Sequence, residues 1–173
     1  GIEFDVHAYG KELIVAHDPF IKGVKLEKFL KTNKNRFCAI NIKEDGIEKE
    51  VIELSIDLGL KDFFLFDVNF PQIYRLGQEY KKHMCIRISE YEKPPLEELR
   101  DYSNYLWIDS FNGKFWMNDK EIIEIKNLKY SMCFVSPELH TPNVKKQIKF
   151  SKTINENIHF FDEHDHICTK DYK

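Results

Sequence analysis

The sequence predicts an α/β fold of the TIM (β/α)8 barrel type. Three observations carry this prediction. Short apolar strands alternate with helices along the chain, which is typical of a parallel sheet with crossover helices. Nearly every strand ends in a polar residue, and the ligand site of a barrel lies at the carboxyl ends of its strands. No glycine-rich phosphate loop follows the first strand, which disfavours a dinucleotide-binding fold.

The expected strands number seven and are evenly spread. They lie at residues 2–6, 37–43, 63–67, 84–89, 105–110, 130–136 and 166–169. Helices are expected between them, near residues 26–30, 47–58, 71–80, 96–102, 118–126 and from 142 onward, where Val144 and Ile148 give the apolar spacing. A barrel of this type needs eight strands. We therefore expect the first strand to come from a segment upstream of Gly1.

The length and composition of the chain indicate a folded protein of the size of one domain. The chain has 173 residues, of which 42% are hydrophobic and 14% aromatic, so it can bury a proper core and is not disordered. We expect one domain over residues 1–173. A net charge of −3 leaves no basic stripe for nucleic acid. No apolar run approaches the ~20 residues of a membrane span, and no signal peptide is visible.

The cysteines indicate a reducing compartment. Cys38, Cys85, Cys133 and Cys168 each fall in a predicted strand, and none belongs to a C-x-x-C motif. Buried thiols are therefore favoured over disulfides or a zinc site. We expect a cytoplasmic protein.

The stretch from Gly1 to Pro19 carries the clearest chemistry. Apolar and polar residues alternate from Ile2 onward, so Glu3 and Asp5 share one face of a strand. Two carboxylates at this spacing can chelate one hard cation. A turn and a second apolar run then lead to His17 and Asp18. A carboxylate pair followed by a histidine is a plausible metal and acid/base assembly.

This stretch resembles the glycerophosphodiester phosphodiesterase family, within the phosphatidylinositol-phospholipase-C-like superfamily. The shared pattern is Gly-x-Glu-x-Asp-Val, a spacer, and an apolar strand ending in His-Asp. The resemblance implies that Glu3 and Asp5 bind a divalent cation, Mg²⁺ or Ca²⁺, and that His17 is a general acid/base. It also implies a partner histidine on the upstream first strand, which activates the nucleophile, and a small phosphodiester as substrate.

The next strand departs from the family at one position. Asn41 and Lys43 lie two residues apart and share a face. The resemblance implies Glu-x-Lys here, with the Glu as third metal ligand and the Lys facing the phosphate. An amide oxygen can also coordinate Mg²⁺ or Ca²⁺, so we expect Asn41 to bind the cation without adding charge. Lys43 is expected to act in catalysis, or else to be a solvated charge at a strand end.

Four further polar residues lie at strand ends or just past them and form a candidate substrate-binding set: Asp67, Arg87, Asp109 and Glu138. Arg87 is the best candidate for the substrate phosphate, because a guanidinium can grip two oxygens. An ion pair with an aspartate on a neighbouring strand is an equal alternative. Trp107 is expected in the core. The histidines near residues 159–166 indicate a solvated loop more than a metal cluster, and the lysines at residues 145–152 indicate the wet face of a helix.

The sequence therefore predicts a divalent-metal phosphodiesterase. Two alternatives stay open. One is a catalytically degenerate barrel that binds a phosphorylated sugar or a lipid head group. The other is a different metal enzyme on the same scaffold, such as an aldolase or sugar isomerase, because one fold hosts many chemistries.

Overall fold

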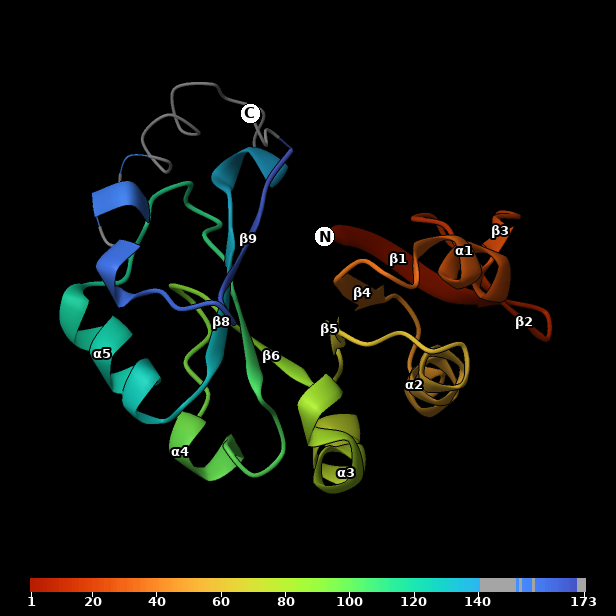
Figure 1. Cartoon of the computed structure of the whole chain (residues 1–173), viewed down its shortest axis with the longest axis horizontal. Helices are drawn as coiled ribbons and strands as arrows, with labels where there is room; N and C mark the ends of the chain where they lie inside the picture. The colour runs from red at the N-terminus through yellow and green to blue at the C-terminus, as the bar shows by residue number, and fades with distance from the viewer. Residues whose placement is uncertain (141–151, 153, 157, 171–173) are drawn as a thin grey trace. The chain divides into compact units, whose positions relative to one another are not determined.

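The computed structural model describes residues 1–140, 152, 154–156 and 158–170 (Figure 1). It is a mixed α/β structure with parallel strands and helices, which confirms the predicted α/β class. The chain divides into two compact units. Unit 1 comprises Gly1–Ile86 with Asp101–Ser103, and unit 2 comprises Arg87–Arg100 with Asn104–Lys173.

Unit 1 contains a five-stranded sheet in the order β3-β2-β1-β4-β5. Its strands are β1 (Ile2–Tyr9), β2 (Glu12–Val15), β3 (Val24–Lys25), β4 (Cys38–Ile42) and β5 (Phe63–Phe66). β1, β4 and β5 are parallel, whereas β1 and β2 form an antiparallel hairpin. Gly10 in the hairpin turn has φ 65°, a conformation that glycine adopts at no steric cost.

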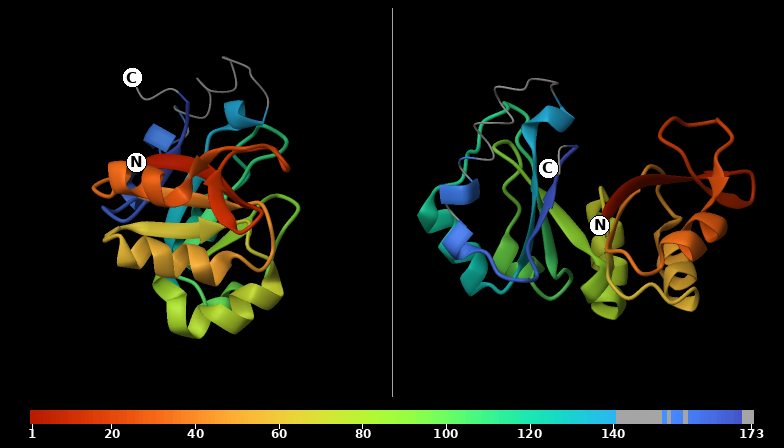
Figure 2. Two further views of the ribbon diagram at one scale, coloured as in Figure 1. Left: turned by 90° about the vertical axis from the view of Figure 1, so that its right-hand side faces the viewer. Right: turned by 45° about the horizontal axis from the view of Figure 1, so that its top comes forward.

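The helices of unit 1 are α1 (Leu26–Asn33), α2 (Glu48–Asp57), α3 (Phe70–Tyr80) and the 3₁₀ turn η1 (Lys81–His83). Figure 2 shows the long strand β1 with α1 beside it. Phe4 of β1 contacts Phe29 of α1, with ring centroids 4.7 Å apart. Because side chains alternate along a strand, Phe4 and Val6 face the helices, and Glu3 and Asp5 lie on the opposite face.

Local sequence signals explain where these helices begin and end. The side chain of Asn69 accepts the backbone N–H of Gln72, and Pro71 occupies the first turn of α3, where its missing N–H costs nothing. α2 stops before Gly59, which has φ 79°. Gly77 of α3 packs against the backbone of Tyr102, so closely that a Cβ there would lie 2.5 Å from the Tyr102 carbonyl oxygen.

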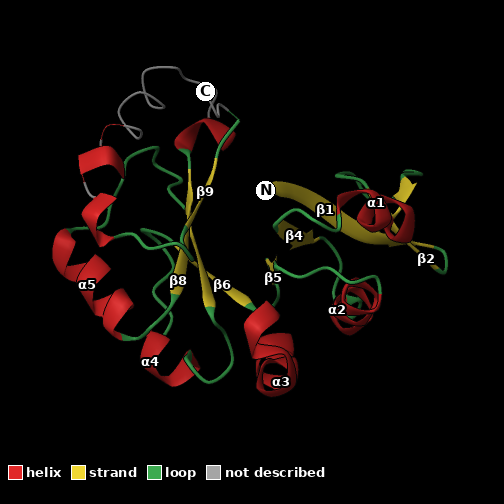
Figure 3. Cartoon of the chain, viewed as in Figure 1, coloured by secondary structure: helices red, strands yellow, loops and turns green. Residues whose placement is uncertain are grey.

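Unit 2 is built on a four-stranded sheet in the order β6-β7-β8-β9. These strands are β6 (Cys85–Ile88), β7 (Tyr105–Ile108), β8 (Ser131–Val135) and β9 (His166–Cys168), and β6 begins in the last residues of unit 1. The helical elements are α4 (Leu96–Leu99), α5 (Asp119–Asn127), η2 (Pro137–Leu139) and η3 (Ile158–Phe160). Figure 3 shows strands and helices following each other along the chain.

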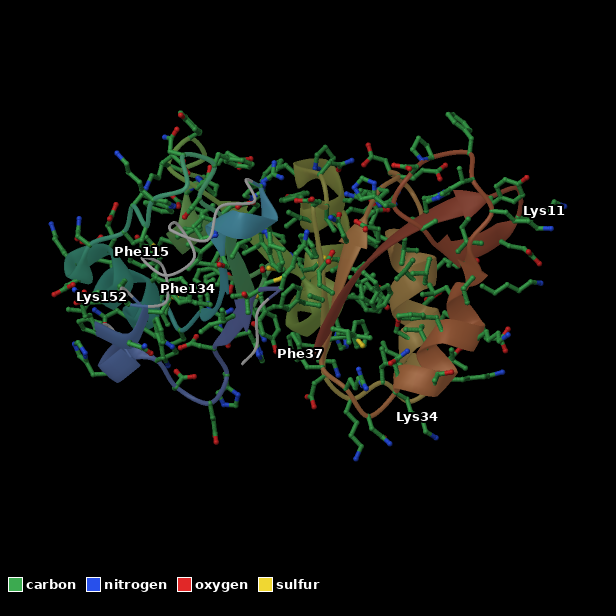
Figure 4. The ribbon with its side chains drawn as sticks, turned by 90° about the horizontal axis from the view of Figure 1, so that it is seen from above. Lys11, Lys34, Phe37, Phe115, Phe134 and Lys152 are labelled. Atoms are coloured by element: carbon green, nitrogen blue, oxygen red, sulfur yellow. The ribbon has the colours of Figure 1, made fainter. Side chains whose placement is uncertain are left out.

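The core of unit 2 is aromatic around β8. Phe134 lies 5.8 Å from Phe115 and 4.8 Å from Phe161 between ring centroids, and Figure 4 labels the first two. Trp107 is buried, as predicted. Asn118 and Glu121 form a capping box at the start of α5, which satisfies two backbone N–H groups that the helix itself leaves unbonded.

All seven expected strand positions carry a strand. The predicted helix with Val144 and Ile148 and the lysines Lys145, Lys146 and Lys149 lie outside the described residues. The thiols of Cys38, Cys85 and Cys133 are buried, and that of Cys168 is half-buried. Within the described part of the chain, no helix is both long and apolar enough to cross a membrane.

Candidate active site

The parallel register of β1 and β4 puts the predicted metal ligands of unit 1 on one face of the sheet. In the parallel register Glu3 lies opposite Ala39, and Asp5 lies opposite Asn41. Register partners in a parallel pair point to the same side of the sheet. Glu3, Asp5 and Asn41 therefore share the face that is turned away from α1. Lys43 follows β4 on the same face, and its backbone N–H donates to the Val6 carbonyl over 3.0 Å.

Lys43 is engaged with one of the two carboxylates. Its Nζ lies 3.1 Å from Oδ1 of Asp5, and the two side chains are 30% and 19% exposed. Partial burial strengthens such a pair relative to a fully solvated one. The lysine therefore lies beside one of the two carboxylates that are predicted to bind the cation.

The pKa of Glu3 is shifted by its burial and by the charged residues around it. Its pKa is raised to about 7, first by desolvation and then by the negative charges of Asp5 and Asp67, whereas Lys43 and His17 lower it. Protein atoms surround much of the carboxylate, although the residue as a whole is exposed, so solvent moderates the effect. Like charges that crowd one site raise a carboxyl pKa in this way, and a bound cation would relieve them.

Asp67 follows β5 with φ 57°. This left-handed conformation is uncommon for a residue other than glycine, although aspartate tolerates it better than most. Asp67 acts on Glu3 through its charge. Phe66, the residue before Asp67, pairs with Asn41, so Asp67 lies at the same end of the sheet as Asn41 and its register partner Asp5.

His17 lies at the end of the hairpin strand β2. The backbone N–H of Ala16 donates to the Asp5 carbonyl over 3.2 Å, which ties this segment to β1. His17 Nδ1 donates to the Asp18 carboxylate over 2.8 Å. A carboxylate only accepts hydrogen bonds, so Nδ1 carries a hydrogen and Nε2 is the atom available for proton transfer. The imidazole is 75% exposed and can be reached by a substrate.

An open pocket of about 690 Å³ lies beside these groups. Its lining includes His17, Asp18 and Lys43, together with His7, Ala8, Tyr9, Gly10, Pro19, Phe20 and Glu44. Lys43 therefore belongs both to the carboxylate cluster and to the pocket wall. The pocket volume falls in the range of small-molecule sites.

The donor set suits a hard divalent cation. Mg²⁺ and Ca²⁺ prefer carboxylate and amide oxygens, and Glu3, Asp5 and Asn41 offer these. Asn41 is 7% exposed, and no described residue gives its Oδ1 a hydrogen bond. Buried amide oxygens are normally bonded, so a cation would satisfy this atom. In the described part of the chain, no three His, Cys, Asp or Glu side chains form a metal-binding group, and Asn41 is needed to complete the set.

The other predicted substrate-binding residues, Arg87, Asp109 and Glu138, belong to unit 2, and Arg87 and Asp109 have protein partners. Arg87 donates from Nε and Nη2 to the two carboxylate oxygens of Glu92, over 2.9 and 3.0 Å. This ion pair joins β6 to the loop that follows it. The pairing leaves phosphate binding by Arg87 an untested prediction. The side chain of Glu138 lies outside the described atoms.

Asp109 is 3% exposed and pairs with Nε2 of His140, 31 residues later. The sequence offered no signal for this pair, because it depends on a long-range contact. In the tail, Asp165 bonds Lys126 and the backbone N–H of Met132. Asp165 thus anchors its loop, and its side chain is 4% exposed, where the sequence indicated a solvated loop.

His7 is the residue of this site that the sequence reasoning missed. It is 3% exposed and lines the pocket. The signal was present, because the two-residue period that pairs Glu3 with Asp5 also puts His7 on their face.

Comparison of the sequence with family models and with curated proteins finds no match.

Proposed function

We propose that this protein is a divalent-metal-dependent phosphodiesterase that hydrolyses a glycerophosphodiester-like or related phosphodiester. One observation carries the proposal. Two carboxylates and a buried amide oxygen without a described partner share a sheet face, and Lys43 lies 3.1 Å from one of those carboxylates. We further propose a TIM-type barrel as the fold. Its support is that Asp5, Lys43 and Asp67 gather at the carboxyl ends of three neighbouring parallel strands.

Glu3, Asp5 and Asn41 would hold the cation. When bound, it would draw negative charge off a non-bridging phosphate oxygen. Lys43 Nζ, beside Asp5, donates to another phosphate oxygen and stabilises the charge that develops in the transition state. A water molecule attacks the phosphorus atom as the bond to the alcohol breaks. His17, in its imidazolium form, gives the proton on Nε2 to the leaving alkoxide, while Asp18 keeps its ring oriented.

A second candidate function follows from the Lys43–Asp5 pair. The lysine already balances one carboxylate charge, and Asn41 supplies no charge of its own. A site of this kind can bind a phosphorylated sugar or lipid head group through Lys43 without turnover. The buried thiols support a cytoplasmic location for either function.

Hydrolysis assays with the full-length protein test the proposal. Bis(4-nitrophenyl) phosphate and a panel of glycerophosphodiesters are incubated with Mg²⁺, Ca²⁺ or Mn²⁺, and each reaction is repeated with excess chelator. We expect metal-dependent release of the alcohol that stops with chelator. Binding of metal without hydrolysis of any diester would reject the enzyme and favour the binding protein.

A further inference from the structure

His7 is one of the residues that line the pocket, and its ring has a buried hydrogen-bond acceptor. Its Nδ1 lies 2.9 Å from the Ala8 carbonyl oxygen, which can only accept, so Nδ1 carries the hydrogen. In the neutral ring, Nε2 then has the lone pair. No described residue donates to this buried Nε2. Since buried acceptors normally have partners, a ligand with an O–H or N–H group would complete the site.

The other residues that line the pocket indicate what kind of ligand would fit it. Tyr9, Pro19 and Phe20 contribute three ring side chains, and Phe20 is 91% exposed with φ 64°. A bulky residue in this conformation is strained, so the fold holds an aromatic ring outward at a cost. The carboxylates of Asp18 and Glu44 add further acceptors. The pocket therefore combines flat apolar surface with acceptors, which suits a ring that carries hydroxyl groups.

We propose that this pocket binds the sugar ring of a sugar phosphodiester, with His7 Nε2 accepting a hydrogen bond from a ring hydroxyl. The inference rests on the function proposed above, which puts the phosphate at Lys43. Because Lys43 lines the pocket and contacts Asp5, a phosphate bound to Lys43 would be next to both the pocket and a proposed metal ligand. His7 then sets specificity and takes no part in the chemistry.

Two other alcohols fit the wall less well. Choline would satisfy the aromatic and acidic groups, since aromatic faces attract quaternary ammonium ions, but once its hydroxyl is esterified to phosphate it has no O–H or N–H to donate to Nε2. Glycerol has hydroxyls but no flat face for Tyr9 and Phe20. A site built to bond a hydroxyl discriminates strongly against ligands that lack one, because the buried acceptor is then left unpaired.

The chain provides a matched control in His83. This histidine is 4% exposed, its Nδ1 bonds the Phe63 carbonyl over 3.0 Å, and its buried Nε2 has no described partner. It differs from His7 in its surroundings. Its ring stacks on Phe63 with centroids 3.9 Å apart, and it is not among the residues that line the pocket. The same substitution at both positions separates ligand binding from burial.

The test measures binding of phosphate monoesters by calorimetry to the full-length protein, to His7→Asn and to His83→Asn. An asparagine amide can replace Nδ1 as donor to the backbone carbonyl while removing the Nε2 acceptor. The ligands are glucose, galactose and mannose 1-phosphates, glycerol 3-phosphate and phosphocholine. We expect at least one sugar phosphate to bind about tenfold or more tighter than phosphocholine. His7→Asn should abolish that preference, and His83→Asn should keep it.

Absence of sugar phosphate binding, absence of the preference, or its survival in His7→Asn would overturn the inference. If His7→Asn does not fold, nitrogen-15 spectra of the histidines in the unsubstituted protein decide. The His7 Nε2 resonance must shift on adding the sugar phosphate, and an unchanged resonance overturns the inference. Hydrolysis without a role for His7 would remove this inference alone. Conversely, a His7-dependent preference in a protein that hydrolyses nothing would remove only the enzymatic proposal.

Discussion

Lys43 Nζ lies 3.1 Å from Oδ1 of Asp5. The lysine is proposed to bind the substrate phosphate, and the aspartate is proposed to bind the metal ion. The two roles compete. A metal ion on Asp5 meets the repulsion of the ammonium group, and the lysine gives up part of its pairing when a phosphate arrives. The affinity for the cation and the rate of hydrolysis are therefore expected to change in opposite directions when Lys43 is altered.

Lys43→Met should tighten Mg²⁺ binding and reduce hydrolysis. Removing a positive charge near the cation is expected to raise the affinity by about tenfold or less, because the pair is partly solvated. Lys11→Met, at the hairpin turn, where the lysine is exposed and labelled in Figure 4, is the matched control and should change neither quantity. Calorimetric Mg²⁺ titration and initial rates measure the two effects. Weaker Mg²⁺ binding in Lys43→Met would contradict the arrangement.

Asn41→Asp should strengthen the cation site and weaken the protein without metal. The substituted carboxylate would be buried opposite Asp5, so in chelator we expect the free energy of unfolding to fall by about 1–3 kcal/mol. Mg²⁺ should more than restore it, because it binds the folded state. Denaturant unfolding with and without Mg²⁺ measures both effects. If Mg²⁺ gives the variant no larger gain than the unsubstituted protein, Asn41 is not a metal ligand.

His17→Ala should remove turnover and leave the fold and the metal site intact. The imidazole is 75% exposed, so its loss costs little packing, whereas a general acid typically contributes ~10²–10⁴ in rate. Asp18→Asn should give a smaller loss, since it affects only the orientation of the ring. Steady-state rates and Mg²⁺ titrations follow the two variants. Unchanged turnover in His17→Ala would assign proton transfer to another group.

His83 should make the protein less stable in mild acid. Burial lowers its pKa below the ordinary value of 6.5. The unfolded chain therefore binds a proton at His83 more readily than the folded protein does. The stability that neutral His83 contributes is complete above the unfolded pKa of 6.5 and is lost as the pH falls through the folded pKa. His83→Asn should lose less stability between about pH 8 and pH 5. Glu3, whose raised pKa acts in the opposite direction, is common to both proteins. Identical pH profiles of the unfolding midpoint would refute the expectation.

Gly77→Ala should destabilise unit 1. The added Cβ would lie 2.5 Å from the Tyr102 carbonyl oxygen and 2.7 Å from its Cβ, and backbone must move to admit it. We expect a loss of about 1–3 kcal/mol, although alanine is the better helix former. Gln78→Ala, on the exposed side of α3, should be close to neutral. Urea unfolding of both variants gives the comparison, and a stabilised Gly77→Ala would show that this approach is not tight.

The strands and the site residues Glu3 and Asp5 could be predicted for the same reason, because both follow from the alternation of apolar and polar residues along the chain. Alternation from Ile2 to Val6 defines β1 and also places Glu3 beside Asp5. β3 was missed because two residues carry no period. The division into two units was also not expected, because neither composition nor a linker marks the boundary.

Contacts between distant residues explain the rest. The partner of Asp109 is His140, and the partner of Asp165 is Lys126. Such pairs are created by tertiary packing and leave no trace in spacing. His7 is different, because its face could be read from the alternation. His7 differs from a solvated strand residue in its burial and in its bond to the Ala8 carbonyl. No local sequence pattern reveals either feature.

The short outer strand β3 has a consequence for how the protein behaves in a crowded solution. A sheet that ends in a long exposed strand offers unpaired N–H and C=O groups to other chains. Here the outermost strand is only Val24 and Lys25, and Lys25 forms an ion pair with Glu12 of the neighbouring strand. A second molecule would find little backbone to pair with and a charged side chain in its way, which opposes edge-to-edge aggregation at the β3 edge of the sheet.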